Sequence, residues 1–314
     1  MSRADRPSGS AHRSSTEVRG ASGPIAETES EVRLGRLWLW LSSTAALLAA
    51  AGSVVGLAAA DRVYGQETDT LADQAAAQDV VGLTIVAPLL GVLGVGAARG
   101  SLRAYLGWSG CLAFTAYNYA IYTVSIQFGP LFLVWVAVLG LSVFALVGGL
   151  STLPAATVKT RFAARALMLP AWFVIAVGGL FALLWLSEIV PDLLAGDPSR
   201  SATDWDVPTN PVHILDLALF LPAVVTSGVL LLRRHPFGYA TVVGQLAWLA
   251  LTCLPILVTP FVAASRGHEP GWAVMLPIGV VLVAVLGVLG VTLRKASDSA
   301  AVASEPVASA PSGT

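Results

Sequence analysis

The sequence predicts an all-α integral membrane protein with eight transmembrane helices, arranged as two tandem four-helix units in parallel orientation. Of its 314 residues, 55% are hydrophobic and only 12% are charged, and the mean hydropathy is +0.74. This composition is too apolar for a soluble globular domain. Eight apolar runs each approach the roughly 20 residues that a helix needs to cross a hydrocarbon core. Lys and Arg gather in alternate connections between these runs, which indicates a fixed orientation in the bilayer.

The eight runs define the expected domain organisation. The first four-span unit covers 37–153, a cytoplasmic linker follows at 154–165, and the second four-span unit covers 166–293. The tails at 1–36 and 294–314 contain too few large apolar residues to order themselves, so we expect both to be disordered and cytoplasmic. The spans are placed at 37–60, 80–98, 104–126, 130–153, 166–190, 212–232, 238–262 and 271–293.

The distribution of basic residues predicts the orientation. If the N-terminus is cytoplasmic, only Arg62, Arg200 and Arg266 of the 18 Lys and Arg residues fall on the outer side. Short loops rich in Lys and Arg stay on the cytoplasmic side of a membrane. We therefore expect a multi-pass protein with both termini cytoplasmic and an even number of spans.

The first span has an alternative interpretation as a cleaved signal peptide. It starts with Trp38 and Trp40, aromatic rings of the kind favoured at a membrane interface, and Ala58-Ala59-Ala60 resembles a signal-peptidase site. Its apolar run of about 24 residues is longer than the 7–15 residues of a signal peptide. The length favours a retained span.

Two outer loops are expected. Loop 61–79 holds five acidic residues and one basic residue, Arg62. Its acidity indicates either a vestibule that attracts cations or simply that basic residues are kept on the cytoplasmic side. We prefer the second interpretation. Loop 191–211 contains four prolines, which argue against a regular helix through it.

The third span carries a stripe of small and polar side chains at intervals of three and four residues, which places them on one helix face. An amide in hydrocarbon needs partners, so Asn118 is expected either to hold neighbouring helices together or to line a cavity. Cys111 and Cys253 lie within spans and are interpreted as buried small hydrophobes rather than as a disulfide framework. The stripe consists of Cys111, Thr115, Asn118, Tyr122 and Ser125.

An offset of 134 residues aligns spans one to three with spans five to seven without gaps. Because Trp, Pro and Gly are rarer here than Leu, Val and Ala, their coincidence favours a tandem repeat over chance. Four spans per unit make both units enter the membrane from the same side, the parallel kind of repeat. The aligned pairs include Trp38 with Trp172, Pro88 with Pro222, Gly94 with Gly228, Arg99 with Arg233, Tyr105 with Tyr239 and Gly110 with Gly244.

The two halves differ in the number of ionisable residues at aligned positions near the outer ends of their spans. Asp79 and Gly82 align with His213 and Asp216, and Val54 aligns with Glu188. His213 and Asp216 are three residues apart and share a helix face, and Glu188 ends the preceding span at a comparable depth. Ionisable residues inside a span are costly and mark a site by default.

We therefore predict an outward-facing polar cavity lined by Asn118, Tyr122, Glu188, His213 and Asp216. In this hypothesis His213 and Asp216 form a hydrogen-bonded pair that binds or relays protons or a polar ligand. The structural alternative is an ordinary helix start, with Asn210 before Pro211 and an acidic side chain near the helix N-terminus.

Other chemistry has little support in the sequence. One His and two carboxylates lack the spacing of a metal-binding motif, so we expect no metal site and no cofactor. Phosphate-binding Gly loops and basic aromatic surfaces are absent, so we expect no nucleic acid partner. The expected partners are the lipid bilayer and a small-molecule ligand from the outer side.

The signature P-T-N-P-V-H-x-L-D-L, here Pro208 to Leu217, resembles that of a group of bacterial multi-spanning membrane proteins, and the similarity covers spans three to seven. The resemblance implies a bacterial plasma (inner) membrane protein and no particular activity. The sequence thus favours a non-enzymatic protein of transport or ligand sensing. The alternatives are a membrane-embedded enzyme using His213 with Asp216 or Glu188 as acid and base, and a structural membrane subunit.

Overall fold

The computed structural model describes residues 32–162 and 167–297, and every regular element within these ranges is a helix. Predictions for the tails at 1–31 and 298–314, and for linker residues 163–166, lie outside the described residues. The helices are α1 (Arg36–Ala58), α2 (Ala60–Tyr64), α3 (Asp69–Val81), η1 (Gly82–Val86), α4 (Ala87–Ala98), α5 (Leu102–Ser125), α6 (Phe132–Thr152), α7 (Ala155–Arg161), α8 (Met168–Ala195), α9 (Arg200–Asp204), α10 (Pro211–Leu215), η2 (Asp216–Phe220), α11 (Leu221–Leu232), α12 (Pro236–Arg266), η3 (Trp272–Val274) and α13 (Met275–Lys295).

Seven helical segments of the described residues are long and apolar enough to cross a membrane. Two of them are continuous through a π-helical turn, since α3, η1 and α4 form one segment and α10, η2 and α11 form another. The all-helical fold and the multi-spanning character are therefore as predicted. The segments are Arg36–Ala58, Asp69–Ala98, Phe132–Thr152, Met168–Ala195, Pro211–Leu232, Pro236–Arg266 and Trp272–Lys295.

Helix α5 is 24 residues long and is not among these seven. It carries buried polar side chains, including Ser109, Thr115 and Asn118, and it contacts α4, α6 and α12. A helix enclosed by other helices meets little lipid, so its side chains need not be uniformly apolar. Burial by protein explains why α5 is less apolar than the seven segments.

The second predicted span starts too late. Helix α3 starts at Asp69, so the loop expected at 61–79 is wrong: it contains α2 and most of α3. The segment after Thr68 is rich in Ala, the best helix former, and the Thr68 Oγ1 accepts a hydrogen bond from the Leu71 N–H as an N-cap. Polar residues in this segment lower its hydropathy and conceal the helix.

The loop expected at 191–211 is also shorter than predicted. Helix α8 continues through Pro191 to Ala195 and ends at Gly196, which has a φ of +74°. Glycine suits this left-handed end because it has no Cβ to clash. Within the remaining connection α9 forms one short helix, and Trp205 is buried beside it.

The first half forms a closed arrangement in which α1 contacts α4 and α6, and α5 contacts the same two helices. Two glycines make this possible. A Cβ at Gly148 would overlap the ring of Trp38, and one at Gly149 would lie 2.6 Å from the ring of Trp108. The indole N–H of Trp108 also donates to Ser42 Oγ at 3.2 Å. Small residues that admit large rings hold these helices close together.

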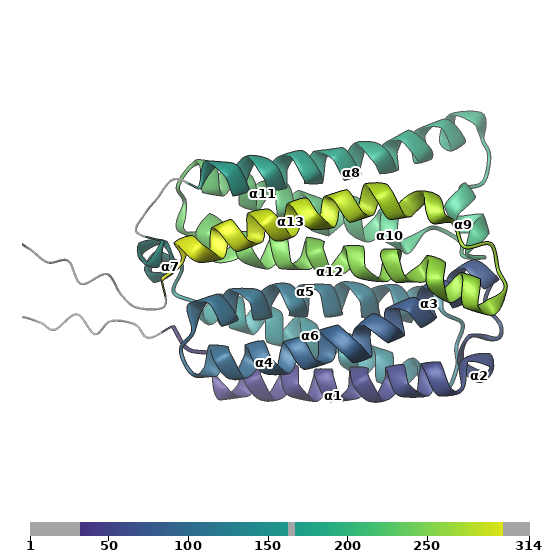
Figure 1. Ribbon diagram of the computed structural model, residues 1–314, viewed down its shortest axis with the longest axis horizontal. Helices are drawn as coiled ribbons and strands as arrows, with labels where there is room; N and C mark the ends of the chain where they lie inside the picture. The colour runs from purple at the N-terminus through teal and green to yellow at the C-terminus, as the bar shows by residue number, and fades with distance from the viewer. Residues whose placement is uncertain (1–31, 163–166, 298–314) are drawn as a thin grey trace, which may run out of the picture. The chain divides into compact units, whose positions relative to one another are not determined.

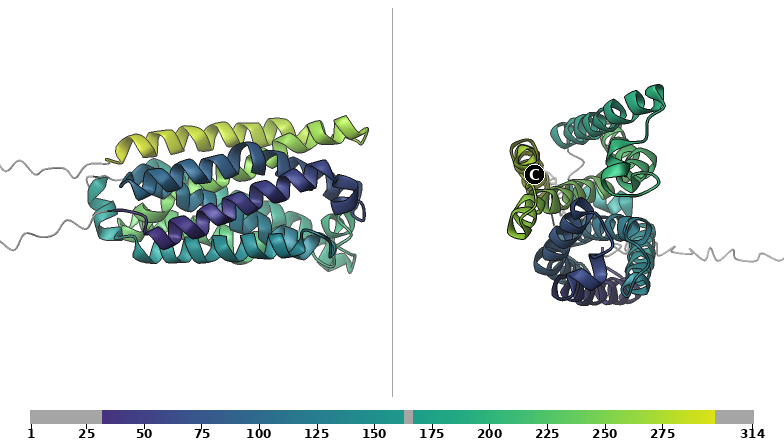
Figure 2. Two further views of the ribbon diagram at one scale, coloured as in Figure 1. Left: turned by 90° about the horizontal axis from the view of Figure 1, so that it is seen from below. Right: turned by 90° about the vertical axis from the view of Figure 1, so that its right-hand side faces the viewer.

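The second half is more open. Helix α11 packs against α8 and α12, and α12 packs against α13, but α8 and α13 touch only weakly. In the end-on view of Figure 2, α8 and α13 lie apart from each other. Helix α12 also contacts α3 and α5, so the two halves meet mainly through it.

Gly110 of α5 and Gly244 of α12 touch directly at this junction. A Cβ at Gly110 would overlap the Gly244 carbonyl oxygen and lie 2.7 Å from the Ala247 Cβ. These two glycines are 134 residues apart. Only residues without a side chain allow the two backbones to approach so closely.

Other structural features also recur after 134 residues. The π-helical turns η1 and η2 start at Gly82 and Asp216, and left-handed backbone occurs at Gly100, with φ of +92°, and at Arg234, with φ of +54°. A π-helical turn is rare in any helix. Here it occurs at two positions 134 residues apart, within the segments Asp69–Ala98 and Pro211–Leu232.

Lys and Arg gather at one end of the described helices and most Asp and Glu gather at the other, called here the basic end and the acidic end. The basic end contains α7, the connections that lead into α5 and α12, and the end of α13. It is tied together by backbone bonds from Leu34 N to Ala97 O and from Ser297 N to Arg161 O, and by Arg103, which donates to Ala296 O. Val32 and Leu34 are buried here, within the tail predicted at 1–36.

The acidic end contains α2, α9 and the start of α3 (Figure 1). Thr68 Oγ1 donates to the Asp204 carbonyl at 2.8 Å, which joins the two halves. Asp73, which is buried, pairs with Arg266 at 3.2 Å and with His268 Nδ1 at 2.8 Å. Ion pairs and hydrogen bonds thus fasten α3 to the end of α12.

Glu67 lies at this end and provides a test of pH dependence. Burial raises the pKa of Glu67 above its ordinary value. The hydrogen bond that its Oε1 accepts from the Gln127 N–H at 2.8 Å lowers the pKa, but by less. A raised pKa means that the folded state favours the neutral acid, so stability is lost as the pH rises through the folded-state value. We expect Glu67→Gln, which stays neutral, to melt at a slightly higher temperature than the wild type at pH 7. The difference should vanish near pH 4, about the unfolded pKa; a lower melting temperature for the variant at pH 7 would contradict this.

Candidate binding site at the acidic end

The helix that carries the candidate site starts as the sequence indicates. Asn210 is the N-cap of α10, its Oδ1 accepts from the Val212 N–H at 2.9 Å, and Pro211 occupies the first turn. The helix-start role predicted for Asn210 is confirmed. His213 then follows in the same short helix, and Asp216 starts the π-helical turn η2.

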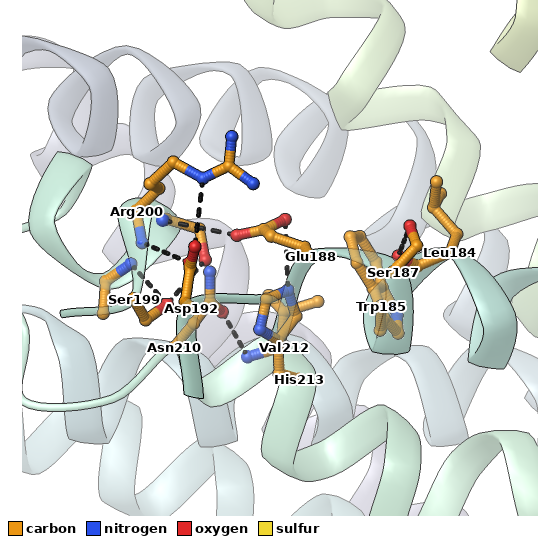
Figure 3. Close-up of polar contacts among 12 residues, drawn as sticks. Leu184, Trp185, Ser187, Glu188, Asp192, Ser199, Arg200, Asn210, Val212 and His213 are labelled. Carbon is orange, nitrogen blue, oxygen red and sulfur yellow. Dashed lines mark hydrogen bonds and ion pairs between the residues drawn. The ribbon is translucent and has the colours of Figure 1, made fainter. Parts of the chain in front are cut away.

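His213 lies between two partners on α8 (Figure 3). Its Nε2 is 3.9 Å from Glu188 Oε2, and its imidazole packs against the Trp185 ring with centroids 4.7 Å apart. The His213 side chain is buried, whereas that of Glu188 is about one quarter exposed at 26%. An imidazole in this position becomes an ion-pair partner of Glu188 when it is protonated.

Asp216 is held by Trp185 rather than by His213. The Trp185 indole N–H donates to Asp216 Oδ2 at 2.8 Å. The other oxygen, Oδ1, is buried and has no hydrogen-bond partner among the described residues, although the Tyr117 hydroxyl of α5 lies close enough to interact with the carboxylate. A buried carboxylate oxygen without a partner is costly.

The expected His213–Asp216 hydrogen bond is therefore replaced by a bridge through Trp185. The Trp185 indole packs against the His213 imidazole with the two rings tilted by 46°, and its N–H donates to the Asp216 carboxylate. Spacing on one helix correctly suggests that the two side chains share a face. It cannot show that a large residue of the neighbouring helix reaches both of them.

Glu188 also contacts the short helix above the site. Its Oε1 accepts from the Ser201 N–H at 3.3 Å, and one turn further along α8 Asp192 binds the Arg200 backbone N–H at 3.2 Å (Figure 3). These contacts fix α9 over the end of α8. Glu188 is consequently the group that lies between the capping segment and the buried imidazole.

The structure divides the five predicted site residues into two groups. Glu188, His213 and Asp216 come together around Trp185, whereas Asn118 and Tyr122 lie with Asp79 in the first half. Tyr122 donates to the Ala75 carbonyl at 2.8 Å and lies 3.4 Å from Asp79 Oδ1. Asn118 lines a small cavity beside the same carboxylate. Neighbouring residues of α5 thus face different groups, because Tyr117 approaches Asp216 and Asn118 faces the first half.

Asp79 is the residue that the sequence did not single out as a site. It is buried at 2% exposure, and its Oδ2 accepts from the Tyr64 hydroxyl at 2.5 Å. Room for this pair is left by Gly56 of α1, where a Cβ would overlap the Asp79 carboxylate. Burial raises the pKa of Tyr64, which lies in α2, so its hydroxyl keeps its proton and acts as the donor.

Comparison with known proteins adds no assignment. No family model, curated protein or solved structure matches the chain. No group of three or more His, Cys, Asp or Glu side chains suited to a metal ion occurs in the described ranges. A function must therefore be argued from the geometry of these side chains.

The signals for the missed residues are weak but identifiable. Trp185 precedes Glu188 by three residues, which places both on one face of α8. Asp79 aligns with His213 in the 134-residue comparison, and both lie three residues before a π-helical turn. A position that is ionisable in both halves is a stronger sign of a site than the acidic composition of a loop.

Proposed function

We propose that the chain crosses the membrane eight times, with α5 as the eighth span, and that its two four-helix units are a parallel tandem repeat. The recurrence of the π-helical turns after 134 residues and the contact between Gly110 and Gly244 support the repeat. Two units related by an axis along the membrane normal place equivalent residues opposite each other at that axis. In this arrangement the start of α1 and the end of α13 lie on the same side.

We propose further that the basic end faces the cytoplasm and the acidic end faces outward, in a bacterial plasma membrane. The basic end contains most of the described Lys and Arg residues, and such residues are retained on the cytoplasmic side. The site around Trp185 is then reached from outside.

The function supported best is sensing of a positively charged species, a proton in the simplest case, by Glu188, His213 and Asp216. One observation carries this proposal: a continuous series of contacts leads from partly exposed Glu188 through His213 and Trp185 to buried Asp216. A proton or small cation entering at Glu188 would neutralise charge that the apolar surroundings disfavour. The partnerless Asp216 oxygen is where such neutralisation stabilises most.

Sensing is favoured over transport through the whole membrane because of where charged groups lie. In the described parts of the spans, Asp, Glu and His occur in the half nearer the acidic end. A proton path across a membrane needs ionisable groups or water along its length. The enzyme alternative has less support, because the imidazole and the nearest carboxylate are 3.9 Å apart, beyond hydrogen-bond reach.

The test uses Trp185 as its own reporter. Protonation of His213 places a positive charge against the indole, which should quench its fluorescence. We expect the emission difference between the wild type and Trp185→Phe to fall as purified protein is taken from pH 8 to pH 5. His213→Gln should abolish this change, and Glu188→Gln should move its midpoint, because the ion-pair partner is removed.

One control keeps the experiment interpretable. His268→Gln removes a histidine at the same end that contacts Asp73 and not Trp185, so the fluorescence change should persist. If the change persists in His213→Gln or is lost in His268→Gln, the proposed sensing site is incorrect.

A further inference from the structure

A small cavity lies in the first half, between α1, α3 with η1, and α5. Its volume of about 10 Å³ leaves room for roughly one water-sized particle. Part of its lining is apolar and includes Ala49, Val86 and Phe114. Six oxygen-bearing side chains also line it: Ser53, Gln78, Asp79, Thr115, Asn118 and Tyr119.

All six of these residues are buried, the most exposed being Asn118 at 9%. Thr115 Oγ1 donates to the Cys111 carbonyl at 2.8 Å, which leaves its lone pairs available. The amides of Gln78 and Asn118 make no hydrogen bond to another residue in the part of the chain that the structure describes. Gln78 and Asn118 are 7% and 9% exposed as residues, so the natural place for a partner of their amides is the cavity that both residues line.

The charge of Asp79 is met by neutral hydroxyl groups alone. Its Oδ2 accepts from the Tyr64 hydroxyl, Oδ1 lies 3.4 Å from the Tyr122 hydroxyl, and the Ser53 hydroxyl is close enough to interact with the carboxylate. No Lys, Arg or His within the described ranges forms an ion pair with Asp79. When Asp79 is ionised these hydroxyls stabilise its charge, and a carboxylate ionised among apolar residues needs a counter-charge.

We propose that this cavity binds a single dehydrated monovalent alkali cation, coordinated by Asp79 together with the neutral oxygens of Ser53, Gln78 and Asn118. The ligands are hard oxygens, the kind that alkali and alkaline-earth cations prefer. One carboxylate neutralises one positive charge, so a divalent ion would leave an uncompensated charge in an apolar site. The size of the cavity excludes an organic amine.

The backbone next to the cavity fits this role. The π-helical turn η1 starts at Gly82, which lines the cavity, and a Cβ there would lie 3.2 Å from Ser53 Oγ. Irregular backbone at membrane depth is tolerated where it lines a buried polar site, and distorted helices often supply cation sites in membrane proteins. The inference goes beyond the proposed sensing function and does not depend on it, because it concerns different residues in the other half.

The experiment measures cation binding to the intact wild-type protein in detergent. Binding of radioactive ²²Na⁺ is followed in choline chloride at constant ionic strength, with competition by unlabelled Na⁺ and by K⁺. We expect saturable binding of one ion per chain, and the competition shows which alkali ion is preferred. A ligand that binds only the folded state stabilises it, so the preferred ion should also raise the melting temperature to a plateau.

Three variants locate the site. Asp79→Asn should abolish binding, and Asn118→Ala, which keeps the carboxylate, should weaken it roughly tenfold or more. Asp73→Asn is the matched control, because Asp73 lies on the same helix but contacts Arg266 and His268, and binding should be unchanged.

The proposal is overturned if wild-type protein binds neither Na⁺ nor K⁺ saturably, or if Asp79→Asn binds as the wild type does. An alkali-independent melting temperature combined with a more stable Asp79→Asn variant would indicate a protonated Asp79, and would also overturn it. If Asp79→Asn does not fold, the wild-type titration and Asn118→Ala still decide the outcome.

Discussion

Asp216→Asn is expected to stabilise the protein and, at the same time, to move the midpoint of the pH response at Trp185 to lower pH, because a negative charge near His213 is removed. The amide oxygen of the introduced asparagine can still accept the Trp185 indole N–H, which is bound at 2.8 Å in the wild type. The substitution removes the negative charge and the buried carboxylate oxygen that lacks a partner. A charge buried among apolar groups is costly, so a gain in the free energy of unfolding is expected at neutral pH.

A gain in stability with a shifted pH response would identify Asp216 as a functional group, because functional sites often retain costly buried charges. The measurements are the free energy of unfolding in detergent and the Trp185 difference fluorescence. Asp192→Asn is the control on the facing helix. Asp192 pairs with the exposed Arg200 at 3.5 Å, so its replacement should leave the fluorescence response intact and change stability little. Marked destabilisation by Asp216→Asn would instead assign the carboxylate a structural role.

Gly110→Leu is expected to cause the largest loss of stability among the substitutions considered. A side chain at Gly110 would overlap the Gly244 backbone and the Ala247 Cβ, so α5 and α12 must separate where the two halves meet. Overpacking a buried contact costs about 1–3 kcal/mol, and because backbone rather than a flexible side chain blocks the space, the upper part of this range is expected. The measurement is the loss of helical signal on titration with a denaturing detergent.

Gly140→Leu provides the matched comparison, since nothing lies within 4 Å of a Cβ placed at Gly140 of α6. Replacing an unneeded helical glycine removes its entropic cost, so Gly140→Leu should be neutral or slightly stabilising. If the two variants are equally stable, α5 and α12 do not rely on close backbone contact, and the junction between halves lies elsewhere.

Much of the fold follows from the sequence because apolar runs and helix breakers mark most spans directly. The predicted start at 104 and the observed start of α5 at Leu102 are close, and the expected role of Asn210 is found. The failures have physical causes. Asp69, Asp73 and Gln78 make the start of α3 look like a polar loop, yet Asp73 and Gln78 are buried by protein at the start of a long helix.

The candidate site was less predictable than the fold. Helical spacing places His213 and Asp216 on one face, but the residue that joins them, Trp185, comes from another helix. Likewise, Asn118 and Tyr117 are adjacent in sequence and approach different carboxylates. Periodicity describes one helix at a time, whereas the environment of a side chain depends on which neighbouring helix covers it.

The most direct test of the sensing proposal is the sidedness of the pH response. The Trp185 difference fluorescence is recorded in sealed lipid vesicles of known protein orientation while the pH is stepped on one side only. We expect a change when the step is applied at the acidic end, its loss in His213→Gln, and no change when the step is applied at the basic end. A response to pH at the basic end alone, or none from either side, would contradict the conclusion that Glu188, His213 and Asp216 take up a cation from the outer face.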